Sequence, residues 1–339
     1  MSEDTVRMMP AQAHEELLAQ TAIVWDYDYP LAQSLESRPY HLGMISMGAV
    51  LGVEARTIKR WTDDEFAFME NAKVIVVNLF TAMGMVQALK AMWPDKIICV
   101  SPDFTIDQVD VGHRGLLWDY VLREIRAADY ILGRTMQNAV YYGGIADKPF
   151  FFLPIPIGPQ EYFDQFQNTP PEDFFMLVGH SWKESTYRQN LIVARDIQRL
   201  TGLKCKYINR REGVQEEAEA LGLDAVYYGL TDFQVVMHLT SRAQFVIDLY
   251  QAHTVGRVEL TSYYAGTPCI GSNLTHANHP LKFPPLDIIR PAQVGVRMFE
   301  VPEYRAELVR EGQLMLSLEH SFDAVRRKFK YILENVWPS

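Results

Sequence analysis

The chain has 339 residues, a length typical of two α/β domains, and 48% of them are hydrophobic, enough for two cores. Its formal net charge of −10 argues against an extensive nucleic-acid-binding surface, because such surfaces are basic. Cys99, Cys205 and Cys269 lie far apart in apolar runs, so we expect buried thiols rather than disulfides or metal ligands. No apolar run has the length of a membrane span and the N-terminus does not resemble a signal peptide, so we expect a soluble, cytoplasmic protein with no transmembrane segment.

The first half of the chain alternates short apolar runs with helical patterns. The predicted strands cover residues 21–27, 73–79, 96–101, 129–134 and 149–155. The predicted helices between them cover residues 41–53, 81–93 and 115–128. Continuous apolar runs between helices are typical of strands buried on both faces, and therefore of a parallel sheet.

A proline-rich segment, residues 154–173, separates this half from a second series of the same kind. The second series has predicted strands at 174–179, 204–209, 225–230 and 244–250, and predicted helices at 186–202, 213–222 and 232–243. A last helix, 306–336, is predicted to break near Ser321.

The two series predict an α/β protein with two Rossmann-like domains that face a central cleft. We place the N-terminal domain at residues 1–158 and the C-terminal domain at 159–320. A C-terminal helix, residues 321–339, is expected to pack back toward the N-terminal domain.

Ligands of parallel sheets bind beyond the carboxyl ends of the strands, and this rule selects the loop from Gly179 to Ser185. A glycine follows the strand there, and Lys183 and Arg188 lie at the start of the next helix. Those cations and the helix N-terminus are suited to a phosphate group, although both residues could equally be solvated surface charges. The chain has no Walker A motif and no GxGxxG motif, which argues against the usual ATP- and dinucleotide-binding sites.

The stretch "DLYQAHTVGRVELTSYYAGTPCIGSN", residues 248–273, contains a carboxylate in an apolar helical pattern. Glu259 falls early in the predicted helix, where it could accept two hydrogen bonds from ribose hydroxyls. The alternative is that it only complements the helix dipole. Gly266 is expected to end the helix as a left-handed cap, and Thr267 and Pro268 lead into the next strand.

Asp103, after the strand 96–101, is expected at the mouth of the N-terminal sheet, either as a sugar-binding acid or as a turn residue. His41, His113 and His180 are candidate bases. His276 and His279 have no spacing partner that would indicate zinc.

The order of these segments resembles the GT-B glycosyltransferases, particularly the retaining group that uses nucleotide-sugar donors. That group carries an E-x7-E motif followed by "AxAxGxPVI.S", and this chain has Gln251, then Glu259, then "SYYAGTPCIGSN". Its "FFMLVGHSWKESTYRQNL" and "AVYYGLTDFQVVMHLTSRAQFVIDL" also resemble motifs of that group. The resemblance extends over roughly residues 70–275.

The resemblance implies roles for individual residues. Glu259 matches the glutamate that binds the donor ribose, and Lys183 lies near the phosphate-binding lysine with Arg188 beside it. The full set of implied donor-binding residues is Gly179, His180, Lys183, Arg188, Gly229, Leu230, Thr231, Gln251, Gly256, Arg257 and Glu259. The chain departs from the group at two positions, because Gln251 replaces the first glutamate and Pro102-Asp103 replaces a histidine motif of the N-terminal domain. Gln251 and Asp103 are the candidate catalytic residues.

The implied activity is transfer of a sugar from a nucleotide diphosphate-sugar, expected to be a UDP-sugar, to an acceptor hydroxyl, with retention. The resemblance implies no further cofactor and no metal, since lysine and arginine supply the positive charge. The acceptor could be a glycan, a small molecule or a modified DNA base. Two alternatives stay open: a phage-type glucosyltransferase acting on a hydroxylated nucleobase, and a degenerate protein that binds nucleotides or glycans without catalysis.

Overall fold

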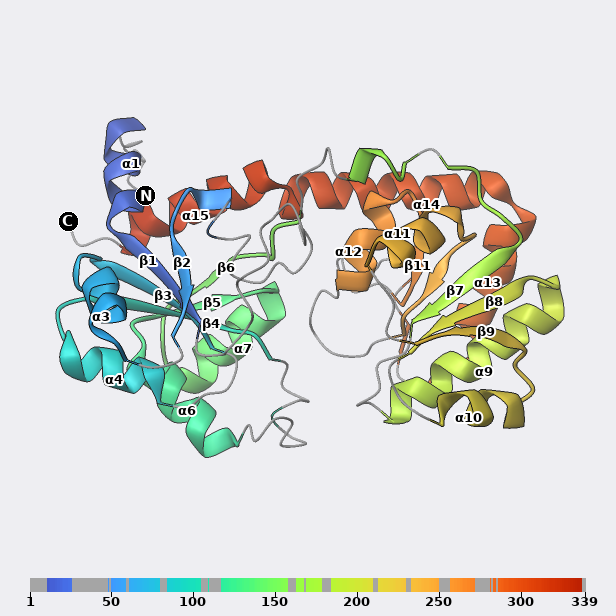
Figure 1. Cartoon of the computed structure of the whole chain (residues 1–339), viewed down its shortest axis with the longest axis horizontal. Helices are drawn as coiled ribbons and strands as arrows, with labels where there is room; N and C mark the ends of the chain where they lie inside the picture. The colour runs from blue at the N-terminus through green and yellow to red at the C-terminus, as the bar shows by residue number, and fades with distance from the viewer. Residues whose placement is uncertain are drawn as a thin grey trace, which may run out of the picture. The chain divides into compact units, whose positions relative to one another are not determined.

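The computed structural model describes residues 11–25, 48, 50–58, 61–79, 84–104, 109, 117–157, 163–167, 169–178, 184–209, 213–229, 233–249, 257–271, 281, 283–284 and 286–336. The chain forms two compact units. Unit 1 comprises residues 1–157 and 320–339, and unit 2 comprises residues 158–319. Each unit is built around its own sheet of parallel strands (Figure 1).

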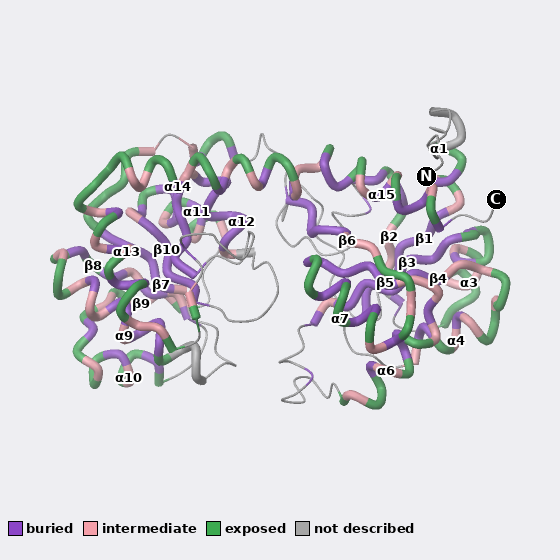
Figure 2. Tube along the Cα trace, turned by 180° about the vertical axis from the view of Figure 1, so that it is seen from behind, coloured by how far each residue is buried: buried purple, intermediate pink, exposed green. Residues whose placement is uncertain are grey.

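The sheet of unit 1 has the strand order β2-β1-β3-β4-β5-β6. Its strands are β1 (Thr21–Trp25), β2 (Ala55–Thr57), β3 (Val74–Leu79), β4 (Ile97–Pro102), β5 (Tyr130–Gly133) and β6 (Phe150–Phe152). Every residue of β3 is buried, and the central strands are buried along the trace (Figure 2). The four consecutive apolar residues that begin β3, Val74–Val77, are therefore explained by a strand covered on both faces.

Helices cover both faces of this sheet. The described helices of unit 1 are α1 (Ala11–Ala19), α3 (Asp63–Glu70), α4 (Met85–Met92), α6 (Trp118–Ala127), α7 (Met136–Ala146) and α15 (Phe322–Val336). One core joins α3, α4, α6 and α7 to Ile75 and Val77 of β3. The other core joins α1 and α15 to Val74 and Val76 of the same strand.

The C-terminal helix α15 belongs to the core of unit 1, as the sequence predicted. Val325, Phe329, Ile332 and Val336 repeat at helical spacing and are all buried. The predicted break before this helix is a π-helical turn, Leu316–His320. The buried imidazole of His320 contacts the carbonyl oxygen of Ile155 through Nδ1 at 2.8 Å.

The sheet of unit 2 has the strand order β11-β10-β7-β8-β9. Its strands are β7 (Phe174–Val178), β8 (Lys204–Ile208), β9 (Ala225–Tyr228), β10 (Val246–Ile247) and β11 (Cys269–Ile270). Its described helices are α9 (Glu184–Thr201), α10 (Val214–Ala220), α11 (Phe233–Arg242), α12 (Arg257–Tyr264), α13 (Ile289–Glu300) and α14 (Pro302–Met315). The chain order of the strands reverses direction between β7 and β10.

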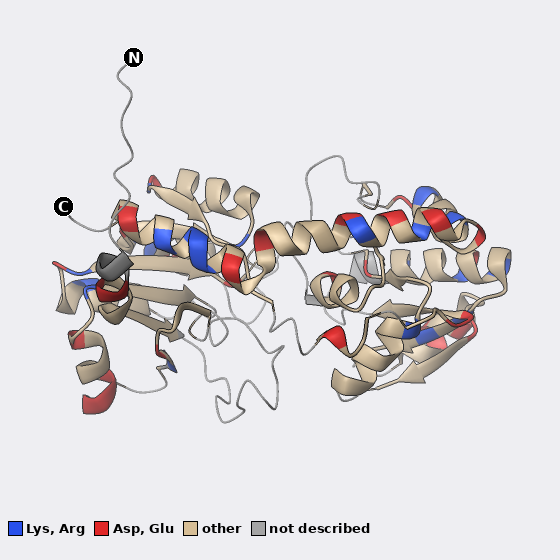
Figure 3. Cartoon of the chain, turned by 90° about the horizontal axis from the view of Figure 1, so that it is seen from above, with Lys and Arg blue, Asp and Glu red and all other residues tan. Residues whose placement is uncertain are grey.

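The helices of unit 2 also lie on both faces of their sheet. Helices α9 and α13 pack together on one face, and α11, α12 and α14 group on the other (Figure 1). Acidic and basic residues are interspersed along α14 (Figure 3). Within this helix Arg305 is partly buried and donates from Nε to the carbonyl oxygen of Gln244 at 2.7 Å, which ties α14 to the segment before β10.

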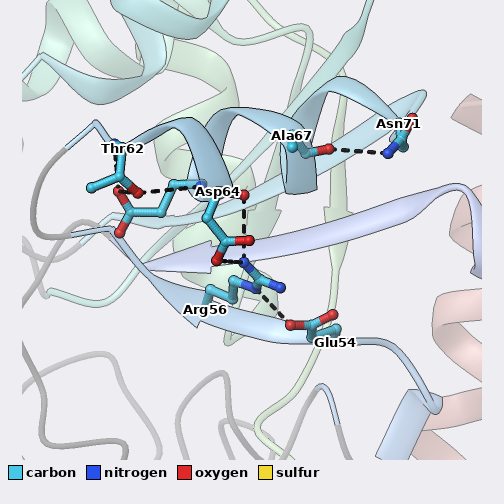
Figure 4. A network of polar contacts seen from close by, with 7 residues as sticks. Glu54, Arg56, Thr62, Asp64, Ala67 and Asn71 are labelled. Atoms are coloured by element: carbon cyan, nitrogen blue, oxygen red, sulfur yellow. Dashed lines mark hydrogen bonds and ion pairs between the residues drawn. The ribbon is translucent and has the colours of Figure 1, made fainter.

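A polar network fixes the edge strand β2 of unit 1 to α3 (Figure 4). Arg56 donates from Nε to Glu54 at 2.6 Å and from Nη1 to Asp64 at 2.8 Å. Thr62 and Glu65 form a capping box that starts α3. A cavity of about 510 Å³ beside this network is lined in part by Thr21, at the start of β1, and by residues that precede β2. It therefore lies at the amino ends of these strands, away from their carboxyl ends.

Close approach of backbone to backbone explains Gly133, the last residue of β5. A Cβ atom at this position would lie 2.2 Å from the backbone nitrogen of Ala139 in α7. We expect Gly133→Ala to lower the free energy of unfolding by roughly 1–3 kcal/mol, the usual cost of overpacking. Urea denaturation measures this change. The control is Gly144→Ala in the same region, where a Cβ meets nothing within 4 Å and a small gain is expected. Equal stability of the two variants would contradict the prediction.

Candidate functional site

The reversal of strand order in unit 2 marks the place where a ligand is expected. In open parallel sheets, ligands bind beyond the carboxyl ends of the strands where the order reverses. Here those strands are β7, which leads into α9, and β10, which leads into α12. The segment after β10 contacts α9, because the backbone N–H of Leu249 donates to Oδ1 of Asn190 in that helix at 2.9 Å.

Two carboxylates are buried at this edge of the sheet. Asp248 directly follows β10 and is 1% exposed, and Glu259, in the first turn of α12, is 0% exposed. Burial raises the pKa of the Cys269 thiol well above its usual value, and the charges of Asp248 and Glu259 raise it further. Both carboxylates therefore raise the pKa of the same thiol, Cys269.

The helix that carries Glu259 ends at a left-handed glycine, as the sequence predicted. Glu259 lies in its first turn, Gly266 has the left-handed φ of 76°, and β11 begins two residues after Thr267. The Thr267 hydroxyl donates to the carbonyl oxygen of Thr240 at 2.7 Å, which fixes the turn to α11. This local geometry holds Glu259 at the switch point.

The other implied donor-binding residues are only partly described. Arg188 is exposed on α9, and Gly229 is exposed just after β9. Arg257 opens α12, and its side chain lies outside the described residues. Gly179, His180, Lys183, Leu230, Thr231, Gln251 and Gly256 also lie outside them. The donor-binding roles therefore stay predictions, as does the catalytic role of Gln251.

Unit 1 has a polar cluster at the carboxyl ends of three neighbouring strands. Asn78 is near the end of β3, Asp103 follows β4, and Arg134 follows β5. Arg134 forms an ion pair with Asp103 and donates from Nη2 to Oδ1 of Asn78 at 2.6 Å. The backbone N–H of Asp103 donates to the carbonyl oxygen of Leu79 at 2.8 Å, which fixes this carboxylate beside β3.

The sequence identified Asp103 but not its two partners. Asn78 and Arg134 were each included in a predicted strand, although a polar residue at the carboxyl end of an apolar run was a visible signal. Asp248 of unit 2 was missed in the same way, and Asn190 was included in the predicted helix 186–202. The candidate bases His41, His113 and His180 lie outside the described residues. Within those residues, no group of His, Cys, Asp and Glu side chains is arranged to hold a metal ion.

The three cysteines are buried free thiols, as predicted. Burial raises the pKa of each thiol above its usual value. Among the helices that the structure describes, none is long and apolar enough to cross a membrane.

Comparison with solved structures identifies the fold. The chain is similar to the structure described as trehalose-6-phosphate from E. coli bound with UDP-2-fluoro glucose, with a TM-score of 0.68 and 8% identity over 94% of this chain and 100% of that one. It is similar to sucrose-phosphate synthase from Thermosynechococcus elongatus, with a TM-score of 0.68 and 13% identity over 94% of this chain and 99% of that one. The fold is GT-B.

Another structural match covers less of both chains, and the sequence comparisons find no match. The chain is also similar to S. aureus TarM in complex with fondaparinux, alpha-GlcNAc-glycerol and UDP, with a TM-score of 0.58 and 9% identity. That match covers 78% of this chain and 55% of the TarM chain. No family model matches the sequence, and no curated protein matches it. At these identities the GT-B chains share an arrangement of strands and helices, and the comparisons show the fold alone.

Proposed function

We propose that the protein transfers a sugar from a nucleotide diphosphate-sugar to a hydroxyl group of an acceptor. The observation that carries this proposal is the buried carboxylate of Glu259, in the first turn of the helix that follows β10, at the switch point of a GT-B sheet. An ionised carboxylate accepts hydrogen bonds only, so it is suited to the two hydroxyls of a ribose.

The charges of the site give the donor an orientation. Asp248 and Glu259 are negative, so a diphosphate placed beside them would be repelled, whereas ribose hydroxyls would donate to them. The diphosphate therefore belongs toward the start of α9, where the helix N-terminus, Lys183 and Arg188 supply positive charge. The turn Gly229-Leu230-Thr231 after β9 would then flank the base.

The proposed chemistry needs little beyond this electrostatic arrangement. The diphosphate gains negative charge as the bond to the sugar breaks, and fixed cations and helix N–H groups stabilise that charge. Gln251 would contact the donor sugar or its phosphate, with transfer occurring with retention. Three structures of similar fold hold related ligands: the E. coli structure holds UDP-2-fluoro glucose, TarM holds UDP, and a pneumococcal O-GlcNAc transferase holds UDP and GlcNAc. We therefore propose a UDP-sugar as the donor.

Thermal unfolding with UDP, GDP and ADP tests the donor site. We expect UDP to raise the melting temperature, because a ligand at one hundred times its Kd stabilises a protein by about 2.7 kcal/mol. Release of UDP from a panel of UDP-sugars, with glycan and small-molecule acceptors, then measures transfer. The absence of a shift with all three nucleotides would contradict the proposal.

The same measurements separate the alternatives. UDP binding without turnover on any donor would favour a non-catalytic nucleotide-binding protein. A mobility shift of duplex DNA at low salt would favour a nucleobase acceptor, since phosphate contacts dominate such binding.

A further inference from the structure

One face of the unit 1 sheet changes from apolar to polar at the carboxyl ends of its strands. Side chains alternate between the two faces along a strand, so residues two apart share a face. Val76 of β3, Cys99 of β4 and Leu132 of β5 belong to the core under α15. Asn78 lies two residues after Val76, and Arg134 lies two residues after Leu132. Asp103 lies four residues after Cys99. The three polar residues therefore continue one apolar face.

Arg134 already interacts through its guanidinium with two protein side chains. It is 7% exposed, forms an ion pair with Asp103, and donates to Oδ1 of Asn78 at 2.6 Å. Its charge is balanced by the carboxylate of Asp103, so an anionic ligand gains little from it. The guanidinium acts instead to fix the orientation of the other two side chains.

The cluster leaves one donor and one acceptor for a ligand. Asn78 is 0% exposed, and its Nδ2 amide has no hydrogen-bond partner among the described residues. Buried donors in native proteins are nearly always paired, so an unpaired amide indicates a missing oxygen atom. The Asp103 side chain is 24% exposed, which leaves its carboxylate accessible to a hydrogen-bond donor. A hydroxyl group both accepts and donates, and it matches this pair.

We propose that Asn78, Asp103 and Arg134 form a subsite for an uncharged, hydroxyl-bearing acceptor, and that Asp103 excludes anionic acceptors by neutralising Arg134. The assignment of this ligand as a sugar acceptor rests on the proposed function. The amide of Asn78 donates to an acceptor oxygen, and the carboxylate of Asp103 receives a hydrogen bond from an acceptor hydroxyl. Arg134 is a positioning residue, because it acts through the other two.

Inorganic phosphate tests the neutralisation of Arg134 without any turnover. In the full chain we expect Asp103→Asn, which keeps the shape of the side chain, to bind phosphate at least about tenfold more tightly than the wild type, on the scale of one charge-assisted contact. The double variant Asp103→Asn with Arg134→Met should lose this gain, which separates the cluster from any phosphate bound in unit 2. Titration followed by thermal shift gives the affinities. Arg134-dependent phosphate binding by the wild type, or no gain in Asp103→Asn, would overturn the proposal.

A second variant tests the amide donor of Asn78. Asn78→Asp keeps an oxygen for Arg134 and removes the Nδ2 donor, and it also places a second carboxylate beside the guanidinium. We expect the KM for an uncharged acceptor to rise about tenfold, while UDP affinity stays unchanged because its site is in unit 2. An unchanged acceptor KM with normal folding would overturn the subsite. Failure of UDP binding in the wild type would instead contradict the proposed function. The phosphate experiment would still test whether Asp103 neutralises Arg134.

Discussion

Glu259→Gln should weaken the binding of UDP roughly ten- to a hundredfold. A hydrogen bond to a charged group contributes about 1.5–3 kcal/mol, and about 1.4 kcal/mol corresponds to tenfold in affinity. The substitution keeps the size of the side chain and its place in the first turn of α12, so it changes charge rather than shape. Isothermal titration with UDP measures the effect.

The ribose assignment has a more specific consequence for Glu259. If the carboxylate binds both ribose hydroxyls, the same substitution should cost less affinity for 2′-deoxy-UDP, because one partner is already absent. Glu300→Gln, at the exposed end of α13, is the matched control and should leave UDP affinity unchanged. Equal losses for UDP and 2′-deoxy-UDP would show that Glu259 does not contact the 2′-hydroxyl. If the affinity for UDP and for 2′-deoxy-UDP were both unchanged, the assignment of Glu259 to the ribose would be wrong.

Burial separates a binding role of Glu259 from a structural one. A neutral amide costs less to bury than a carboxylate, so Glu259→Gln should not lower the free energy of unfolding in the absence of ligand. Glu259 is 0% exposed, which the sequence did not reveal, since its position in the chain predicted only an early place in the helix. A variant that is both unstable and unable to bind UDP would indicate a structural role.

Secondary structure was predictable where the local pattern agreed with the final environment. Strand β3 begins with four consecutive apolar residues, and helix α15 repeats its apolar residues with the period of a helix. Helix α3 was missed, although Thr62 and Glu65 are the residues of a capping box. Helix α7 was missed for a different reason: it contains two adjacent glycines, which weaken a helix. Gly143 is explained only by the fold, because a Cβ there would lie 2.4 Å from the Phe150 side chain of β6.

The candidate sites were predictable to the extent that they depend on strand ends. Asp103 and Glu259 followed from the rule that ligands bind beyond carboxyl ends. The ion pair of Asp103 with Arg134, and the bond of Arg134 to Asn78, join residues from three strands. Such contacts depend on strand order, which an amino-acid sequence with no alignment does not contain. Strand β10 has two residues, whereas seven were predicted. This difference also arises from tertiary structure.

Acidification should destabilise unit 1 through His320. The pKa of this histidine is lowered from 6.5 to about 4, mainly because burial penalises the charged ring, while the hydrogen bond to Ile155 raises it and Lys328 lowers it. Above pH 6.5 the ring is neutral in both the folded and the unfolded chain. As the pH falls from 6.5 to 4, the unfolded chain binds a proton that the folded chain does not, so stability is lost across this window. The expected loss is about 3 kcal/mol, at roughly 1.4 kcal/mol for each pH unit.

His320→Gln isolates this contribution from the titration of carboxylates. Glutamine is neutral throughout and can still donate to the carbonyl oxygen of Ile155, so the variant should lose less stability than the wild type between pH 7 and pH 4. Urea denaturation at several pH values gives both curves, and their difference should change by about 3 kcal/mol in the stated direction. His238→Gln, at an exposed position on α11, is the control for replacing a histidine outside the buried turn. Parallel curves for His320→Gln and the wild type would mean that the imidazole takes up its proton in the folded chain, and that the π-helical turn before α15 opens to admit the charge.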